Sequence, residues 1–146
     1  IYYYEGLPDT VNISGTKGCI KVAHFIGNAP GGKRQGIREI LYQRHKEAMD
    51  IYDQLKADYK AKKITDEQFA EKAKENATNE NLKHPVVIIK PGPNATYEAL
   101  VNAIDELNLN QIRKYSIQMP DRTDTTLLRN YEKATGKTVI RPNVRK

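Results

Sequence analysis

The most regular stretch of the chain is PVVIIKPGPNATYEALVNAIDELNLNQIRKYSIQM, residues 85–119. Residues 85–90 are apolar on both faces, as expected of a central strand that other layers cover. A Pro-Gly-Pro turn follows, and then a helix over 96–107. Its cap is either Thr96 or Asn94. Residues 114–119 alternate strictly between polar and apolar, which predicts a second strand. The order strand, helix, strand predicts parallel pairing through a right-handed crossover.

Upstream of this stretch, apolar residues recur every three or four positions from residue 35 to residue 62. This spacing predicts one long amphipathic helix. At 1.5 Å per residue such a helix is about 40 Å long, more than the width of a small domain. Its far end should therefore protrude or pack on a second helix. Thr65 and Gln68 have the spacing of a capping box, which predicts that second helix as far as Asn76. We expect a protruding helical hairpin at 35–76.

The two ends of the chain carry weaker signals. Residues 1–5 and the alternating stretch 20–26 are predicted to be short strands, because turn residues flank both. A last helix, for which Asp124 is the candidate cap, should end at Gly136. Residues 137–146 contain four basic and no acidic residues, and form a basic tail.

These elements place the chain in the α/β class, as a two-layer α+β fold. We expect a small mixed sheet with helices on one face, containing a β-α-β unit at 85–119 and the hairpin at 35–76. The 146 residues suit a single domain, 1–146. Apolar residues make up 38% of the chain and charged residues 29%. That composition is polar for a globular chain, so part of it should be well solvated.

The net charge is +6, and the positive charge is uneven. Residues 33–63 hold nine basic and five acidic residues, whereas residues 64–84 hold three basic and five acidic. Such a distribution favours either an anionic partner or simple solubility. The basic stretches lack the aromatic and glycine pattern of RNA-binding sheets. A basic α/β nucleic-acid-binding module is therefore the alternative function rather than the first.

Motifs of catalysis are incomplete in this chain. Residues 27–34, GNAPGGKR, fit the start of a phosphate-binding loop, but Arg34 stands where a Ser or Thr hydroxyl should bind magnesium. The single cysteine, Cys19, and three scattered histidines predict no metal site. Asp105 and Glu106 are interpreted as surface carboxylates. We predict no enzyme activity, no catalytic residue and no cofactor.

Residues 85–119 resemble the periplasmic domain of the ExbD/TolR biopolymer-transport family. The resemblance rests on a strand with the pattern Val-Ile-Ile-Lys, a helix with the pattern Tyr-x-x-Leu-x-x-x-x-Asp, and a second strand. Residues 1–6, 36–38 and 64–69 resemble a longer variant of that family with a charged helical hairpin. The matching positions are Val87, Ile88, Ile89, Lys90, Tyr97, Leu100, Asp105 and the strand from Tyr115 to Met119.

The resemblance implies a subunit of a complex that uses proton-motive force to support transport across the outer membrane or maintenance of the envelope. Its implied partners are an ExbB/TolQ-like channel, a TonB/TolA-like protein, a second copy of itself, and peptidoglycan for TolR-like members. It also implies a place on the periplasmic face of the inner membrane, with an N-terminal membrane helix that is not in this sequence. The proton-carrying Asp of the family lies in that helix, so no residue here inherits its role.

The second strand of the family match is the candidate surface for a dimer mate or a partner strand. An edge strand exposes unpaired N–H and C=O groups that recruit another strand. Its apolar side chains are expected to pack on helices and its polar side chains to face water. The alternative is that the strand is internal to the sheet. The candidate residues are Tyr115, Ser116, Ile117, Gln118 and Met119.

Overall fold

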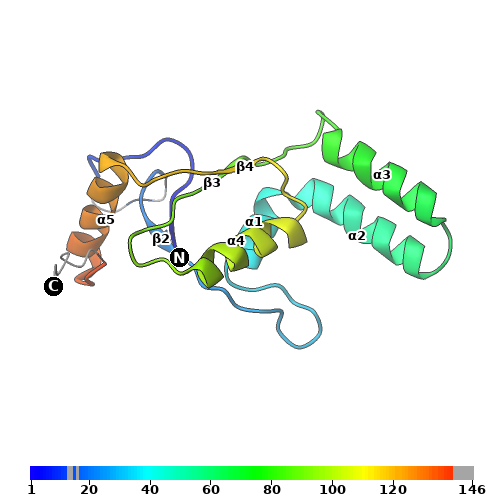
Figure 1. Cartoon of the computed structure of the whole chain (residues 1–146), viewed down its shortest axis with the longest axis horizontal. Helices are drawn as coiled ribbons and strands as arrows, with labels where there is room; N and C mark the ends of the chain where they lie inside the picture. Colours follow the sequence, from blue (N-terminus) through cyan, green and yellow to red (C-terminus); the bar gives the residue numbers. More distant parts are fainter. Residues whose placement is uncertain (13–14, 16, 140–146) are drawn as a thin grey trace. The chain divides into compact units, whose positions relative to one another are not determined.

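The computed structural model describes residues 1–12, 15 and 17–139. These residues form a small α+β fold with five helices and two separate two-stranded sheets, instead of one mixed sheet (Figure 1). The chain divides into two compact units, one made of Ile1–His24 and the chain from Met119 onward, the other of Phe25–Gln118. A single domain over 1–146 stays a prediction. The predicted basic tail at 137–146 lies outside the described residues from residue 140.

The first unit contains β1 (Tyr2–Tyr3) and β2 (Lys21–Val22). They pair antiparallel, with Tyr2 opposite Val22. Both strands lie where the sequence predicts strands, but they are much shorter than the predicted 1–5 and 20–26. The pairing between them is therefore short.

That helix is α5 (Arg122–Thr135). Asp121 caps it, whereas Asp124, the candidate cap, lies three residues later and completes a capping box by accepting the N–H of Asp121 at 2.8 Å. The helix ends at Gly136 in the left-handed conformation, as expected. Tyr131 of α5 meets Tyr2 edge to face, with ring centroids 5.6 Å apart. The helix is thereby joined to the first residues of the chain.

In the second unit, the predicted long helix over 35–62 is two helices, α1 (Ile37–Arg44) and α2 (Lys46–Lys60). They meet at His45, whose φ of −128° and ψ of 24° lie outside the helical range. The side chain of His45 is 2% exposed and bonded to groups far along the chain. Tertiary contacts of this ring therefore override a helical periodicity that continues across it.

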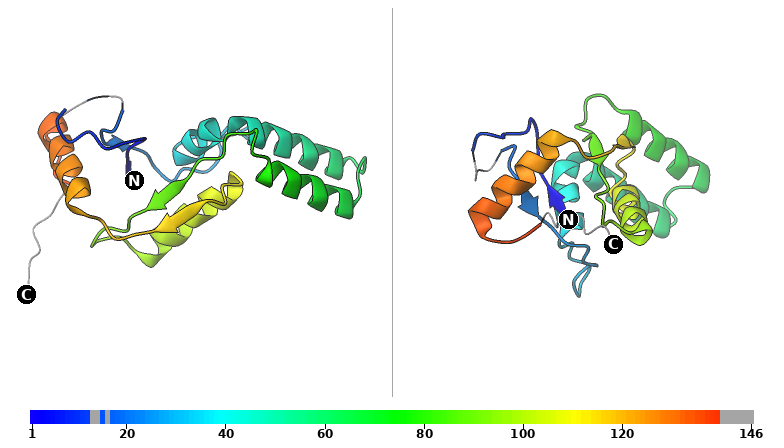
Figure 2. Two further views of the ribbon diagram at one scale, coloured as in Figure 1. Left: turned by 90° about the horizontal axis from the view of Figure 1, so that it is seen from above. Right: turned by 60° about the vertical axis from the view of Figure 1, so that its left-hand side comes forward.

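Helix α3 (Asp66–Thr78) runs beside α2, and the two form a hairpin (Figures 1 and 2). The capping box of Thr65 and Gln68 is confirmed. Phe69 contacts two tyrosines of α2, with ring centroids 6.0 Å from Tyr52 and 5.0 Å from Tyr59. Near the other end of the hairpin, the buried amide of Asn76 donates to the carbonyl of Ala48 at 2.9 Å. Aromatic packing and one buried hydrogen bond thus hold the two helices together.

Strands β3 (Val87–Ile89) and β4 (Tyr115–Ile117) pair in parallel, with Ile88 opposite Ser116. Helix α4 (Tyr97–Leu109) lies between them in the sequence, and Thr96, one of its two candidate caps, accepts the N–H of Ala99 at 3.0 Å. Figure 2 shows the two strands side by side. Helix α4 packs against α1.

Helices α2 and α4 end in the same way. In α4, the N–H of Gln111 donates to Asn108 and that of Ile112 donates to Leu107, the two bonds of a Schellman motif. In α2, the N–H of Lys62 donates to Tyr59 and that of Lys63 donates to Asp58. The residue that these motifs place in the left-handed region is normally glycine, but here it is Gln111 with φ 54° and Lys62 with φ 58°.

Candidate functional site: the open edge of strand β4

Strand β4 has one paired and one open edge. The carbonyl of Lys114 accepts the N–H of Val87 at 2.9 Å, and the N–H of Gln118 donates to Ile89 at 2.9 Å. In a parallel strand the direction of backbone groups alternates from residue to residue. The N–H and C=O groups of Tyr115 and Ile117 therefore point away from β3. In the part of the chain that the structure describes, β4 pairs with β3 alone.

The apolar side chains of the candidate strand are partly exposed, although they were expected to pack on helices. Tyr115 is 37% exposed, Ile117 49% and Met119 83%. Helix α4 packs against α1, and the side chains of this part of the sheet are left partly open. Ser116 and Gln118 are exposed as expected, and the Gln118 amide donates to the Ser116 hydroxyl at 3.2 Å.

Strand β3 is also less covered than its sequence predicts. Val86 is 70% exposed and Ile88 50%, although a run apolar on both faces was expected to be central. Together with Ile117, these side chains place apolar surface on both faces of a two-stranded sheet. A concentration of exposed apolar side chains beside open backbone groups is typical of a surface that another polypeptide covers.

Helix α4 is fixed to α1 by a charged pair that the sequence did not reveal. Glu106, interpreted as a surface carboxylate, is 7% exposed. Its two oxygens accept bonds from the Arg38 guanidinium at 2.9 and 2.8 Å. The bond to Glu106 raises the pKa of Arg38. No local pattern distinguishes Glu106 from its exposed neighbour Asp105, because the partner is 68 residues away.

The loop that partly fits a phosphate-binding motif uses its arginine within the fold. The Arg34 guanidinium bonds Asp53 at 2.8 Å and lies 4.1 Å from the ring centre of Tyr42. The following helix, α1, has Gly36 at its cap and no side-chain capping bond. Arg34 therefore links this loop to α2 instead of standing open for a phosphate.

Residues with metal-ligating side chains do not gather: in residues 1–12, 15 and 17–139 there is no group of three or more His, Cys, Asp or Glu that suits a metal ion. Cys19 is buried, and its thiol lies 3.7 Å from the carbonyl oxygen of Asn12.

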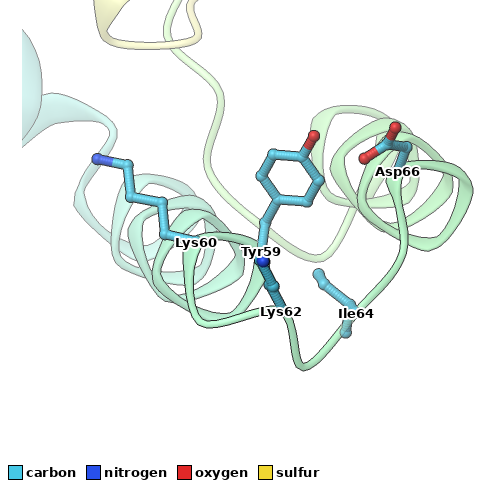
Figure 3. A pocket seen from close by; sticks show the side chains of 5 residues that line it. All are labelled: Tyr59, Lys60, Lys62, Ile64 and Asp66. Atoms are coloured by element: carbon cyan, nitrogen blue, oxygen red, sulfur yellow. The ribbon is translucent and has the colours of Figure 1, made fainter.

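A hollow of about 360 Å³ lies at the turn between α2 and α3. Figure 3 shows Tyr59 pointing into the space between the helices, toward Asp66, whereas Lys60 points away. The hydrogen bond between the Tyr59 hydroxyl and Asp66 raises the pKa of Tyr59. These two polar groups bond each other across the turn between the two helices. We therefore interpret the hollow as part of the packing of the helix ends.

Two histidines that the sequence gives no reason to pair lie together in the second unit. His45 and His84 are 39 positions apart, and their nearest ring nitrogens are 2.8 Å from one another. A smaller pocket opens beside them. Neither residue belongs to a short motif, so only the tertiary structure reveals the pair.

Comparisons of the chain with protein-family models, with curated proteins and with solved structures find no match. Within the described residues, none of the helices combines the length and the apolar character that crossing a membrane requires.

Proposed function

We propose that this chain is a docking domain, the periplasmic part of an ExbD/TolR-like subunit in a proton-motive-force-driven complex of the TonB or Tol type. Its task is to bind other polypeptides, and the open edge of β4 is the surface that binds them. In this proposal β3, α4 and β4 form the β-α-β unit of the family, joined by a right-handed crossover.

The observation that carries the proposal is that one edge of β4 is unpaired and its apolar side chains are exposed. Backbone groups of Tyr115 and Ile117 point away from β3, and the side chains of both residues are more than one third exposed. A strand added at this edge gains backbone hydrogen bonds and buries apolar side chains in one step. Both contributions favour a strand over a small molecule as the occupant.

The family patterns in the sequence support the identity of the partners. The expected occupants are a second copy of this chain or a segment of a TonB/TolA-like protein, in a complex with an ExbB/TolQ-like channel. Peptidoglycan is a further partner if the role is TolR-like. The proton-carrying residue belongs to a membrane helix N-terminal to this sequence, so the domain transmits energy through contacts and performs no proton chemistry of its own.

The test is site-specific crosslinking in the full-length subunit in its own membrane. A photoreactive amino acid replaces Ser116 or Gln118, which flank the open edge, and Lys72, exposed on α3, serves as the control. We expect positions 116 and 118 to capture a second copy or the TonB/TolA-like partner, identified by mass spectrometry. A protonophore should change the yield or the captured partner, because the contact depends on the energised state.

Capture at position 72 with equal yield, or none at 116 and 118, would exclude the edge of β4 as the docking surface. The nucleic-acid alternative has its own readout. If the 146-residue chain binds duplex DNA with an affinity that falls steeply between low and moderate salt, the basic binding module is the better description.

A further inference from the structure

A chain of hydrogen bonds passes through two imidazole rings in the second unit. Nδ1 of His45 lies 2.8 Å from the carbonyl oxygen of Asn110, and its Nε2 lies 2.8 Å from Nδ1 of His84. Nε2 of His84 lies 2.9 Å from the carbonyl oxygen of Asn79. The chain therefore begins and ends at backbone carbonyls, which only accept hydrogen bonds.

The two carbonyls determine how many protons the pair holds. His45 must donate from Nδ1 and His84 must donate from Nε2, because each of these nitrogens faces a carbonyl oxygen. The remaining nitrogens, Nε2 of His45 and Nδ1 of His84, face each other. Two neutral rings with these tautomers would direct two lone pairs at one another. One further proton between the rings completes all three hydrogen bonds and gives the pair one positive charge.

The two rings differ in how deeply they are buried. Burial lowers the pKa of His45, the backbone bond to Asn110 opposes this shift, and the neighbouring His84 adds to it. His45 is 2% exposed, whereas His84 is half-buried. Both rings line a pocket, so the shared charge lies at its wall.

The pocket has a volume of about 200 Å³ and opens where the end of α3, His84 and the loop after α4 come together. Four of its nine lining residues have basic side chains, the two histidines together with Arg113 and Lys114, and none is acidic. Arg113 and Lys114 are exposed and take part in no ion pair within the described residues. Thr78 and Gln111 add polar groups to the wall.

Among the described residues, no acidic residue lines the pocket, and the charged groups next to the pair have partners of their own. Glu106 on α4 is held by Arg38, and Lys46, which follows His45, bonds Asp50 at 2.6 Å. Arg44, which precedes His45, has an interaction partner of its own.

Between α3 and β3, Glu80 and Lys83 are exposed and do not line the pocket. Ile112, which also lines the pocket, is 2% exposed and follows the Schellman turn at Gln111.

We propose that this pocket is a binding site for a small oxyanion, a carboxylate or a phosphate-like group, held by Arg113, Lys114 and the cation shared by His45 and His84. Occupancy depends on pH, because loss of the shared proton removes one of the three positive charges that face the ligand. The side chains differ from those of the β4 edge, so the test is independent of the docking proposal.

The experiment uses calorimetric titration of the 146-residue chain with sodium sulfate, whose charge is constant between about pH 6 and about pH 9. The histidine ring signals are followed by NMR in the same samples. We expect sulfate to shift the His84 signals and to bind about tenfold more tightly at the lower pH. A site made only of Arg and Lys would show no such pH dependence, because neither residue titrates in this range.

The variant Arg113→Gln/Lys114→Gln should weaken sulfate binding by about tenfold or more. Both side chains are exposed, so its thermal midpoint should be unchanged. Lys72→Gln, an exposed lysine of α3, is the matched control and should bind sulfate normally.

Titration with acetate identifies the ligand class, since tighter binding of acetate indicates a carboxylate and tighter binding of sulfate a tetrahedral oxyanion. The proposal is wrong if neither anion binds, if the double variant binds as the wild type does, or if affinity is the same at both pH values.

Discussion

Arg38 and Glu106 are 68 residues apart and form an ion pair with two hydrogen bonds, of 2.9 and 2.8 Å, that fastens α1 to α4. Their side chains are 20% and 9% exposed. A two-bonded arginine–carboxylate pair is directional as well as charged, so it sets the angle between the helices as well as holding them. Strand β4 follows α4 after a connection of residues 110–114.

Glu106→Gln should therefore destabilise the chain. The substitution keeps the shape of the side chain and removes its charge, leaving the guanidinium of Arg38 with a weaker acceptor. We expect the free energy of unfolding to fall by about 2–3 kcal/mol in a urea titration. The double variant Arg38→Gln/Glu106→Gln should lose less than the sum of the two single variants. Additive losses would show that the two side chains act independently.

The exposed pair of Lys46 and Asp50 is the matched control. This pair also joins a basic and an acidic side chain, but both are solvated and lie four positions apart on one helix. Such a pair contributes little to the free energy of unfolding. Asp50→Asn should leave the urea midpoint unchanged.

Lys62→Gly should stabilise the hairpin. Lys62 has a φ of 58° at the end of α2, a conformation that costs a non-glycine residue about 1–2 kcal/mol. Glycine adopts it without that cost but loses more entropy on folding, so the expected net gain is about 0.5–1 kcal/mol, measured by thermal unfolding. The same substitution at Lys56, inside α2, should cost about 1 kcal/mol. A loss at both positions would contradict the Schellman geometry.

The stability of the chain should decrease in mild acid because of His45. Burial lowers the pKa of this ring from its ordinary 6.5, so in acid the unfolded chain binds a proton on His45 that the folded pair, which holds only its one shared proton, excludes. This contribution of His45 to the free energy of unfolding is lost as the pH drops below 6.5.

Urea titrations between about pH 7 and about pH 5, above the range in which most carboxylates titrate, measure this slope. His45→Asn should reduce the slope, whereas His24→Gln, at an exposed position in the first unit, should retain it. An unchanged slope in His45→Asn would assign the acid sensitivity to other groups.

Ile117→Lys should separate docking from folding. Ile117 is 49% exposed, so replacing it should change the free energy of unfolding by no more than about 0.5 kcal/mol. A lysine on an edge strand opposes the addition of another strand, so crosslinking from position 118 should be lost. Leu107→Ala is the contrasting variant: Leu107 is 2% exposed, and its truncation should cost about 2–4 kcal/mol. Unaltered crosslinking in Ile117→Lys would argue against strand addition at this edge.

Features that depend on neighbouring residues could be predicted from the sequence. The capping box of Thr65 and Gln68 and the end of α5 at Gly136 are each decided within a few positions, and the structure has them as predicted. The cap of α4 is Thr96, one of the two candidates. The predicted cap of α5, Asp124, was wrong. The observed cap is Asp121, three residues earlier, which has an equally suitable side chain.

Features that depend on distant partners could not be predicted in this way. The helical periodicity continues through His45, and only its bonds to Asn110 and His84 explain why the helix breaks there. Glu106 has the sequence context of a surface residue, and its burial follows from Arg38. The alternation of β4 correctly places its apolar residues on one face, but what covers a face is decided by other elements or other molecules.

The division of the chain into units has a consequence for its synthesis on the ribosome. The second unit, Phe25–Gln118, is one continuous segment, whereas the first unit combines the earliest residues with those from Met119 onward. A nascent chain therefore contains the whole second unit before any of α5 has been made. Strands β1 and β2 are translated first, but their unit is complete only once α5 has been made. We therefore expect the second unit to fold before the first.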